Sequence, residues 1–288
     1  MASIRAFNLP LVPMGVEIPK KIHQIYTKGE LPEAFSVAVQ TLRSQNPNWI
    51  YRLYSQPDIT SYILNHYGKE ILDLYQSINP QYGAAQADLF RYLLLYREGG
   101  VYLDIKSGSS KPLGEVIRPD DRFIVSGWDR TLPGQGHFGL HPEIIELNSP
   151  VGEIQQWHII TVAGHPFLRA VINHVLSEIA GYSPWRHGVG RKGTYRVTGP
   201  IAYSRAITPL LTHHPHRLTF DTAEGLIYLA AEGSHRRFFK GHYLVRTDPV
   251  VTQRGAKRVM GWVYDGTQRV VRDARRGIRL FRRMTGQL

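Results

Sequence analysis

Residues 83–113 constrain the fold of this chain more than any other stretch. Their first half is rich in alanine, leucine and tyrosine and predicts an amphipathic helix over 84–97. A double glycine then ends the helix, as glycine commonly does, and a short apolar strand is expected over 101–105. This strand delivers Asp104 at its carboxyl end. A helix, a glycine stop and a strand form an αβ unit, so the stretch predicts an α/β fold.

Two charged residues of this helix, Asp88 and Arg91, stand one turn apart. Side chains three residues apart share a helix face, so both can address one ligand. Asp104 is expected where open α/β sheets bind ligands, outside the carboxyl end of a strand. The spacing alone leaves two interpretations open: a ligand site, or a surface ion pair worth a fraction of a kcal/mol.

A pattern of fixed offsets runs through the same stretch. It resembles the core A-x-x-x-D-x-x-R-Y-x-x-L-Y-x-x-G-G-x-Y-x-D-x-D of the Och1-like sugar-nucleotide glycosyltransferases (family 32), which large clostridial glucosylating toxins share. Upstream, 18–26 resembles the opening strand of that family with Tyr26 in place of tryptophan, and 46–54 resembles its second strand. The segments 164–166 and 198–200 resemble later family blocks. The matching residues of the core are Ala84, Asp88, Arg91, Tyr92, Leu95, Tyr96, Gly99, Gly100, Tyr102 and Asp104.

The resemblance implies a fold class and an activity. The fold would be α/β of the GT-A type, with a Rossmann-like, mostly parallel central sheet and flanking helices. The activity would be transfer of a hexose from a nucleotide sugar, with retention of anomeric configuration. The acceptor would be a cell-surface glycan or a lipid-linked glycan precursor, as in polysaccharide biosynthesis. Catalysis would rest on positioning and on neutralising the departing diphosphate.

The resemblance also implies roles for single residues. Ile25 and Tyr26 would hold the nucleotide base, and Asp104 the ribose and the donor sugar. His242 lies near the position of a late active-site histidine of the family, which makes it a candidate catalytic residue. The donor-binding candidates on the helix are Ala84, Asp88, Arg91 and Tyr92, of which Asp88 and Arg91 would hold the hydroxyls of the donor sugar.

One position departs from the family pattern, because the metal motif D-x-D reads Asp104-Ile105-Lys106 here. Mg²⁺ and Mn²⁺ prefer oxygen ligands, so a lysine cannot replace the second carboxylate as a ligand. Its ammonium group can instead offset the charge on the departing diphosphate, which makes Lys106 a candidate catalytic residue. We expect no required metal cofactor; if Mn²⁺ or Mg²⁺ binds, Asp104 is its ligand. The alternatives are a Lys106 that points to solvent, and a catalytically inactive protein that binds nucleotide sugars or glycans.

The charge of the chain divides it into two parts. The 288 residues carry a net charge of +12, and 1–253 are expected to form the catalytic domain. The segment 254–288 holds ten Lys or Arg against two Asp, a net +8. Its apolar residues fall on one helical face, which fits either an anionic membrane surface or a helix packed on the core. If the sugar site is vestigial and only the membrane is bound, the protein would be a basic scaffold at the membrane surface. Nucleic acid is not an expected partner, because no nucleic-acid motif accompanies the arginines.

Composition favours a reducing compartment. The chain has no cysteine, which excludes disulfides and thiolate metal sites. The first fifteen residues lack the charged and apolar regions of a signal peptide, and no apolar run is long enough to span a membrane. We expect a cytoplasmic protein, held peripherally at the inner face of the membrane if the basic segment binds lipid.

The rest of the chain alternates strands and helices, which predicts a mostly parallel sheet covered on both faces. The segments 127–142 and 182–199 are rich in Gly, Pro, His and Arg and are expected to be binding loops. Further strands are expected over 20–26, 49–54, 122–126, 154–162, 217–229 and 241–246, and helices over 33–45, 57–67, 68–78, 166–180 and 201–212.

The second of these loops contains a G-x-G-x-x-G at 188–193 that does not follow an apolar strand, so we do not expect a dinucleotide site. Arg191 and Lys192 within it could still hold donor phosphates or an anionic acceptor. Other aromatic residues are expected to be structural. His213, His214 and His216 predict a surface turn, and His158 and His165 fit a structural role better than catalysis. Trp128 and Trp157 fit core or lid packing better than the alternative, a platform for a sugar ring.

Overall fold

A six-stranded sheet forms the centre of the computed structural model, which describes residues 7–133, 136, 138–231, 246–252 and 267. The order of its strands is β2 (Ile50–Tyr54), β1 (Lys21–Ile25), β3 (Gly100–Leu103), β6 (His158–Thr161), β5 (Phe123–Gly127) and β7 (Arg217–Phe220). Within this sheet β1 pairs parallel with β2 and β3, and β5 pairs parallel with β7. Strand β6 runs antiparallel to both of its neighbours, β3 and β5. Five of the six strands therefore point the same way.

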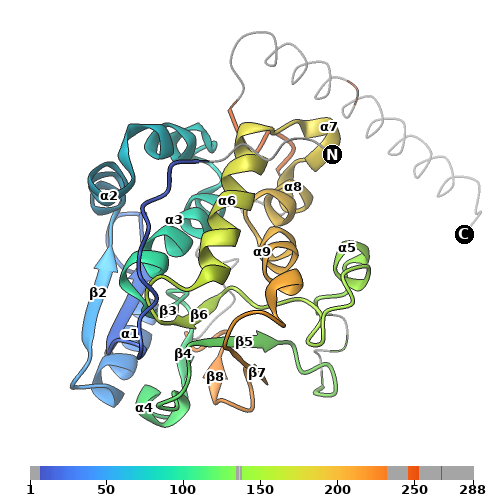
Figure 1. The fold of residues 1–288 in the computed structure, drawn as a ribbon. Coiled ribbons are helices and arrows are strands. Elements are labelled where there is room, and N and C mark those ends of the chain that lie inside the picture. Colours follow the sequence, from blue (N-terminus) through green and yellow to red (C-terminus); the bar gives the residue numbers. More distant parts are fainter. Residues whose placement is uncertain (1–6, 134–135, 137, 232–245, 253–266, 268–288) are drawn as a thin grey trace, which may run out of the picture.

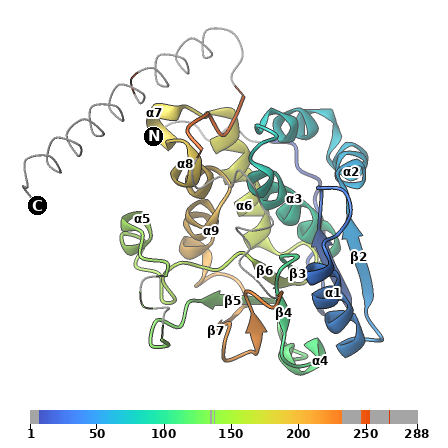
Figure 2. The ribbon, with the colours of Figure 1, turned by 180° about the vertical axis from the view of Figure 1, so that it is seen from behind.

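Helices cover both faces of the sheet because side chains alternate along each strand. In β3, Tyr102 faces the cluster that contains α2 (Gln56–Ser77), α3 (Gly83–Glu98) and α6 (Pro166–Ala180). Val101 and Leu103 face the other way and pack with Leu42 of α1 (Glu33–Gln45). Figures 1 and 2 show the arrangement of the helices around the sheet from opposite sides. The predicted α/β fold class, with a mostly parallel central sheet and flanking helices, is confirmed.

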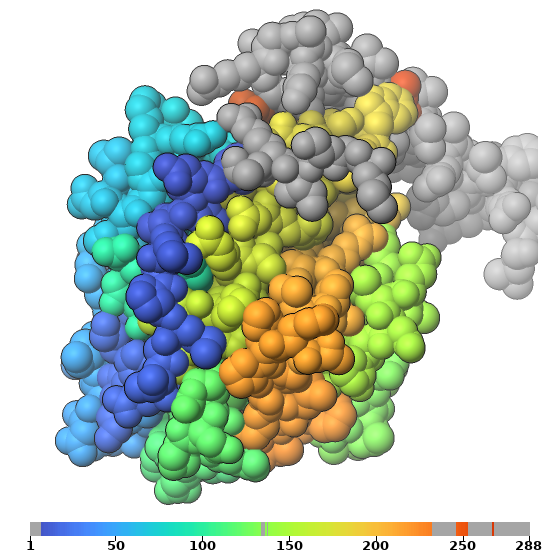
Figure 3. Space-filling model, viewed as in Figure 1, coloured from blue at the N-terminus to red at the C-terminus, as the bar shows by residue number. Residues whose placement is uncertain are grey.

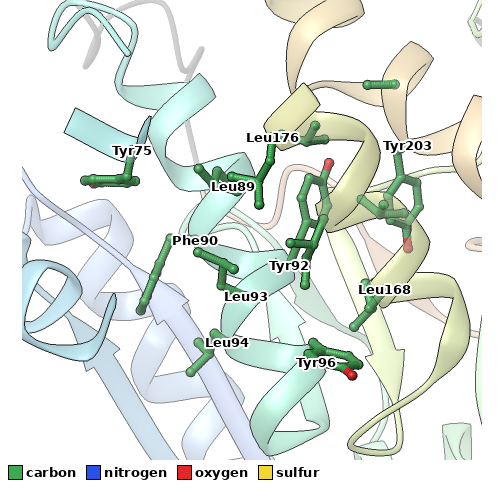
Figure 4. Close-up of a cluster of buried hydrophobic side chains, with 14 of the residues drawn as sticks. Tyr75, Leu89, Phe90, Tyr92, Leu93, Leu94, Tyr96, Leu168, Leu176 and Tyr203 are labelled. Carbon is green, nitrogen blue, oxygen red and sulfur yellow. The ribbon is translucent and has the colours of Figure 1, made fainter. Parts of the chain in front are cut away.

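Helix α3 is a central core helix rather than the amphipathic helix that the sequence predicts. Every residue from Asp88 to Tyr96 is buried. The side chains of this helix fill the space between α2, α6 and α9 (Pro200–Ile207) (Figure 4). A helix that is apolar on nearly all sides belongs inside a protein, and here the charged Asp88 and Arg91 are buried with it.

Most predicted elements lie within one or two residues of the observed ones. Helix α2 follows a capping box formed by Ser55 and Asp58, and it kinks at Gly68, where the φ angle is 77°. The strand predicted over 154–162 is shorter, and the one over 217–229 is split into β7 and β8 (Leu226–Ile227), which pairs with β4 (Gly108–Ser109). The helix predicted over 201–212 is α9 followed by a 3₁₀ turn, Thr208–Leu210.

The interpretation of 182–199 as a loop is wrong. This segment forms α7 (Pro184–His187) and α8 (Gly190–Val197). Two further short helices, α4 (Leu113–Val116) and α5 (Pro142–Ile145), were also not predicted. The strand predicted over 241–246 and almost all of the basic segment 254–288 lie outside the described residues, so the division at residue 253 stays a prediction.

The first described residues form a strap across the surface of the core (Figure 3). The backbone N–H of Val12 donates to the hydroxyl of Tyr96, and that of Gly15 donates to the carbonyl of Ala163. Among the described residues, no helix is both long and apolar enough to cross a bilayer.

The double glycine is required by close backbone contacts. Gly99 has φ 63° and Gly100 has φ 94°, a conformation that favours glycine. A Cβ on Gly100 would lie 2.7 Å from the carbonyl oxygen of Lys21, in the neighbouring strand. This contact fixes the start of β3 against β1, and with it the position of Asp104.

We predict that Gly100→Ala lowers the free energy of unfolding by roughly 1–3 kcal/mol, because alanine adds both backbone strain and a clash with Lys21. Urea unfolding followed by circular dichroism measures the change. Gly114→Ala is the matched control, since a Cβ there has no atom within 4 Å and the expected change is within about 0.5 kcal/mol. Equal effects of the two substitutions would contradict the explanation.

Candidate functional site

A cavity of about 280 Å³ opens at the edge of the sheet where β1, β3 and β5 end. Tyr26 follows β1, Asp104 follows β3 and Trp128 follows β5, and all three line the cavity. The carboxyl ends of parallel strands meet there, which is the usual position of ligand sites in open α/β sheets.

The guanidinium group of Arg91 lies at the centre of the cavity wall. Its Nη2 is 3.0 Å from Oδ1 of Asp88, and its Nη1 is 3.2 Å from Oδ1 of Asp104. Nη1 also donates to the carbonyl of Gln156 at 2.7 Å. The guanidinium lies 4.6 Å from the centre of the Tyr102 ring. Although burial acts to lower the pKa of Arg91, Tyr102 and the two carboxylates outweigh it and raise that pKa. The group is therefore a permanent buried cation.

Asp88 is held in the same network. Thr198 donates its hydroxyl to Oδ2 of Asp88 at 2.9 Å, while Oδ1 faces Arg91. Burial raises the pKa of Asp88 to about 6, against the opposing effects of Arg91 and Thr198. The side chains of Asp88 and Arg91 are only 5% and 6% exposed. The interpretation as a surface ion pair is thereby excluded.

Asp104 stands over the cavity with one carboxylate oxygen engaged. Oδ1 accepts a hydrogen bond from the Tyr102 hydroxyl at 3.0 Å and pairs with Arg91. Its backbone N–H donates to the carbonyl of Trp157 at 2.8 Å, and its carbonyl accepts from the Gln24 amide at 3.2 Å. These contacts fix the residue on both sides, while the side chain stays 22% exposed toward the cavity.

Lys106 lines the cavity next to Asp104, so the expectation that it could point to solvent is wrong. Its side chain is 14% exposed, and Nζ lies 3.8 Å from Oδ2 of Asp104. Nζ donates to the hydroxyl of Tyr228 at 3.0 Å and lies 4.3 Å from the centre of its ring. Because a lysine has three donors, this hydrogen bond leaves two for a ligand.

The described side chains around Asp104 do not fit a divalent cation. No group of three His, Cys, Asp or Glu side chains is placed to hold a metal ion within the described ranges. Oδ1 of Asp104 is taken by Arg91 and Tyr102, and Oδ2 faces the ammonium of Lys106. Arg91 and Lys106 balance the charges of Asp88 and Asp104, so this cluster has no excess negative charge to attract a divalent cation. The Lys106 ammonium group still has donors for an anionic ligand.

Most predicted donor-binding residues meet at this cavity. Its wall includes Ile25, Tyr26, Ala84, Asp88, Arg91, Asp104 and Lys106. Tyr92 is the exception: it is fully buried, donates to the carbonyl of Thr198, and stacks on Tyr203 at 5.3 Å (Figure 4). It faces the core because it follows Arg91 by one residue and so lies on another side of α3. His242 lies outside the described residues.

The remaining polar candidates lie away from the cavity. Arg191 and Lys192 are exposed at the start of α8 and do not line it. Burial lowers the pKa of His158 to about 3 and that of His165 to about 4, so both are neutral structural residues, as predicted. The segment around His213, His214 and His216 is a turn, also as predicted.

The sequence did not predict the aromatic part of the cavity wall. Trp128 and Trp157, expected to be packing residues, line the cavity together with Tyr228. Glu153 lies beside them and accepts a hydrogen bond from Nε1 of Trp128 at 2.8 Å. These residues come from three distant segments, so no local pattern connects them. The one sequence feature that pointed to this part of the wall is the family block 198–200, since Gly199 and Pro200 also line the cavity.

Comparison with known proteins agrees with the geometry. Residues 32–124 match the sequence model of a family described as the glycosyltransferase sugar-binding region containing the DXD motif. Inositol phosphoceramide mannosyltransferase 1 of Schizosaccharomyces pombe is 26% identical over 162 residues, which are 55% of this chain and 43% of that protein. A mannosyl phosphorylinositol ceramide synthase of Saccharomyces cerevisiae is 31% identical over 192 residues, 65% of this chain and 47% of that protein.

A third relative is the initiation-specific alpha-1,6-mannosyltransferase of Candida albicans, which is 28% identical over 60% of this chain and 45% of its own length. The matches thus span less than half of each of these relatives. The solved PaToxG glycosyltransferase has 15% identity and a TM-score of 0.41 over 68% of this chain and 70% of its own. The resemblance to the Och1-like family is confirmed by the family match and by these mannosyltransferase relatives.

We predict that Arg91→Met lowers the free energy of unfolding by about 3–5 kcal/mol, because it leaves Asp88 and Asp104 without their buried counter-charge. Lys69→Met is the control. Lys69 pairs with Asp73 at 2.7 Å, but its side chain is 78% exposed, and the expected loss is about 0–1 kcal/mol. Chemical denaturation measures both. A loss below about 1 kcal/mol for Arg91→Met would show that the buried network does not stabilise the fold.

Proposed function

We propose that this chain, whose residues 32–124 match the glycosyltransferase sugar-binding region containing the DXD motif, transfers a hexose from a nucleotide sugar to a glycan or lipid-linked acceptor. The observation that supports this most is the fixed Asp104 with Lys106 beside it, at the mouth of a cavity on the carboxyl edge of the sheet. A rigid carboxylate and a cation with free donors match the two ends of a sugar diphosphate.

The donor lies across this edge with its base near Tyr26. Tyr26 is partly exposed in the cavity and packs edge-on against Phe35 at 6.2 Å, which fixes its ring. Oδ2 of Asp104 lies beyond hydrogen-bond distance from Lys106, so it can accept from a hydroxyl of the ribose or the donor sugar. Arg91 acts through Asp88 and Asp104, which it holds in place, because its own side chain is almost fully buried.

Lys106 supports the departure of the leaving group. The bond between the anomeric carbon and the diphosphate oxygen breaks, and the nucleoside diphosphate leaves with the electron pair. Two donors of the Lys106 ammonium group offset the charge that develops on it. The acceptor hydroxyl attacks the same face, so configuration is retained, and its proton passes to the leaving diphosphate. No step is assigned to a metal, because the described residues do not fit one.

We predict that the native protein turns over its donor in EDTA and that added Mn²⁺ changes the rate less than twofold. Lys106→Ala should lower turnover at least tenfold, about 1.4 kcal/mol or more of lost charge stabilisation. The control is Lys20→Ala, an exposed lysine away from the cavity. A panel of nucleotide sugars, assayed for nucleoside diphosphate release, measures these rates.

Two outcomes contradict the proposal. Strict dependence of the native protein on Mn²⁺ would remove Lys106 from its role. Tight binding of a nucleotide sugar without release of the diphosphate, with any acceptor mixture, would instead support a catalytically inactive nucleotide-sugar-binding protein.

The basic segment supports a second part of the proposal: peripheral attachment to anionic lipid at the inner face of a membrane, where lipid-linked acceptors would be available. Deleting residues 266–288 should reduce binding to vesicles that contain anionic lipid, and salt should weaken the binding of the full chain. Co-sedimentation measures both effects. Unfolding or precipitation of the truncated chain would show that this segment stabilises the core instead.

A further inference from the structure

The cavity extends beyond the part that a donor would occupy. In the sheet, Asp104 follows β3, with β1 on one side and β6 and β5 on the other. Neighbouring strands are about 4.8 Å apart, so the ends of β1 and β5 are separated by about 14 Å. The donor, as proposed above, occupies the half between Tyr26 and Asp104. The other half of the cavity lies between Asp104 and Trp128. Its wall includes Trp128, Glu153, Gln155, Trp157 and Tyr228.

Resting on the proposed function, we infer that this second half binds the acceptor as a neutral polyhydroxylated ring, a hexose or a cyclitol. Three aromatic side chains from three segments form its wall. The ring of Tyr228 lies edge-on to Trp128 at 5.5 Å and tilted against Trp157 at 5.4 Å. Tyr228 and Trp128 are half-buried, so part of each ring faces the cavity. Apolar ring faces with a few polar groups are typical of small-molecule sites.

The polar groups of this half match ring hydroxyls. Glu153 is held in place by Nε1 of Trp128 at 2.8 Å and by His141 at 3.3 Å. Gln155 also lines the cavity and is 3% exposed, and neither of its amide atoms makes a hydrogen bond within the described part of the chain, although Asp221 lies beside it. Among the same residues, Nε1 of the buried Trp157 has no partner either. Buried polar atoms without a partner are costly, and rotation of the Gln155 side chain toward a ring hydroxyl in the cavity would give its amide one.

The same half lies against the reacting centre. The carbonyl of Trp157 accepts from the backbone N–H of Asp104 at 2.8 Å, and the hydroxyl of Tyr228 accepts from Lys106 at 3.0 Å. A ring held on Tyr228 is therefore next to the residues that hold the donor sugar and its diphosphate. Glu153 is an acidic residue, and the other side chains of this half are uncharged. This composition favours a neutral ring over a phosphate group.

The test uses the native chain and soluble rings. Saturation-transfer NMR with methyl hexosides in one arm and myo-inositol in the other, each with a nucleoside diphosphate present, reports which ring binds. We expect transfer to the protons of one ring class. In the turnover assay, Gln155→Leu and Trp128→Leu should each raise the KM for that ring at least threefold and lower the ratio of sugar transfer to donor hydrolysis. Trp185→Phe, at a residue of α7 that is 53% exposed and not part of the cavity wall, is the control and should change neither.

The outcomes separate this inference from the proposed function. If the native chain hydrolyses a nucleotide sugar but no ring receives saturation, or the KM is unchanged in both folded variants, the acceptor site is elsewhere. If a ring binds but no nucleotide sugar is hydrolysed or transferred, the ring site stands and the transferase proposal fails. Should both variants unfold, the NMR experiment on the native chain alone decides.

Discussion

The buried guanidinium group of Arg91 holds together the two elements that carry the site. It reaches Asp88 on its own helix and Asp104 beyond the end of β3, and a backbone carbonyl of the 153–157 segment closes the third side. A cation with this little exposure is stable only because two carboxylates and the Tyr102 ring surround it. The geometry of Asp104 thus depends on a residue that itself is almost hidden from any ligand.

Lysine in place of a second carboxylate changes the electrostatics of the site, because a positive side chain stands where the D-x-D motif has a negative one. A D-x-D pair attracts a divalent cation, which in turn attracts the diphosphate. Here Nζ of Lys106 lies 3.8 Å from Asp104 and is held by Tyr228 on the other side, and we propose that it supplies this positive charge directly. A single ammonium carries less charge than a metal ion, but its geometry is fixed and requires no coordination shell.

The sequence predicted those parts of the structure that depend on local pattern. The helix of residues 83–98, its glycine stop and the strand before Asp104 follow from residue type and spacing, and the family pattern selected Asp88, Arg91 and Asp104 from the charged residues. Tyr92 matched the pattern too, yet its position on the helix turns its ring into the core, where it stacks on Tyr203 while its hydroxyl bonds to Gln156 and Thr198.

The parts that could not be predicted depend on contacts between distant segments. Residues 188–193 read as a glycine-rich loop, but residues 190–193 form the first turn of α8. Gly193 allows this helix to pack closely, since a Cβ there would lie 2.7 Å from Val250. The aromatic wall combines Trp128, Trp157 and Tyr228, which only the sheet order brings together. No periodicity in the sequence could indicate either arrangement.

The central claim is that Lys106, held beside Asp104 in a network built on Arg91, takes the place of a metal at the diphosphate. A crystal structure of the chain grown with a nucleoside diphosphate and Mn²⁺ tests this most directly, with the anomalous signal of manganese as the readout. The account predicts a phosphate oxygen within hydrogen-bond distance of Lys106 Nζ and no manganese peak at Asp104. A manganese ion bound between Asp104 and the diphosphate would contradict it.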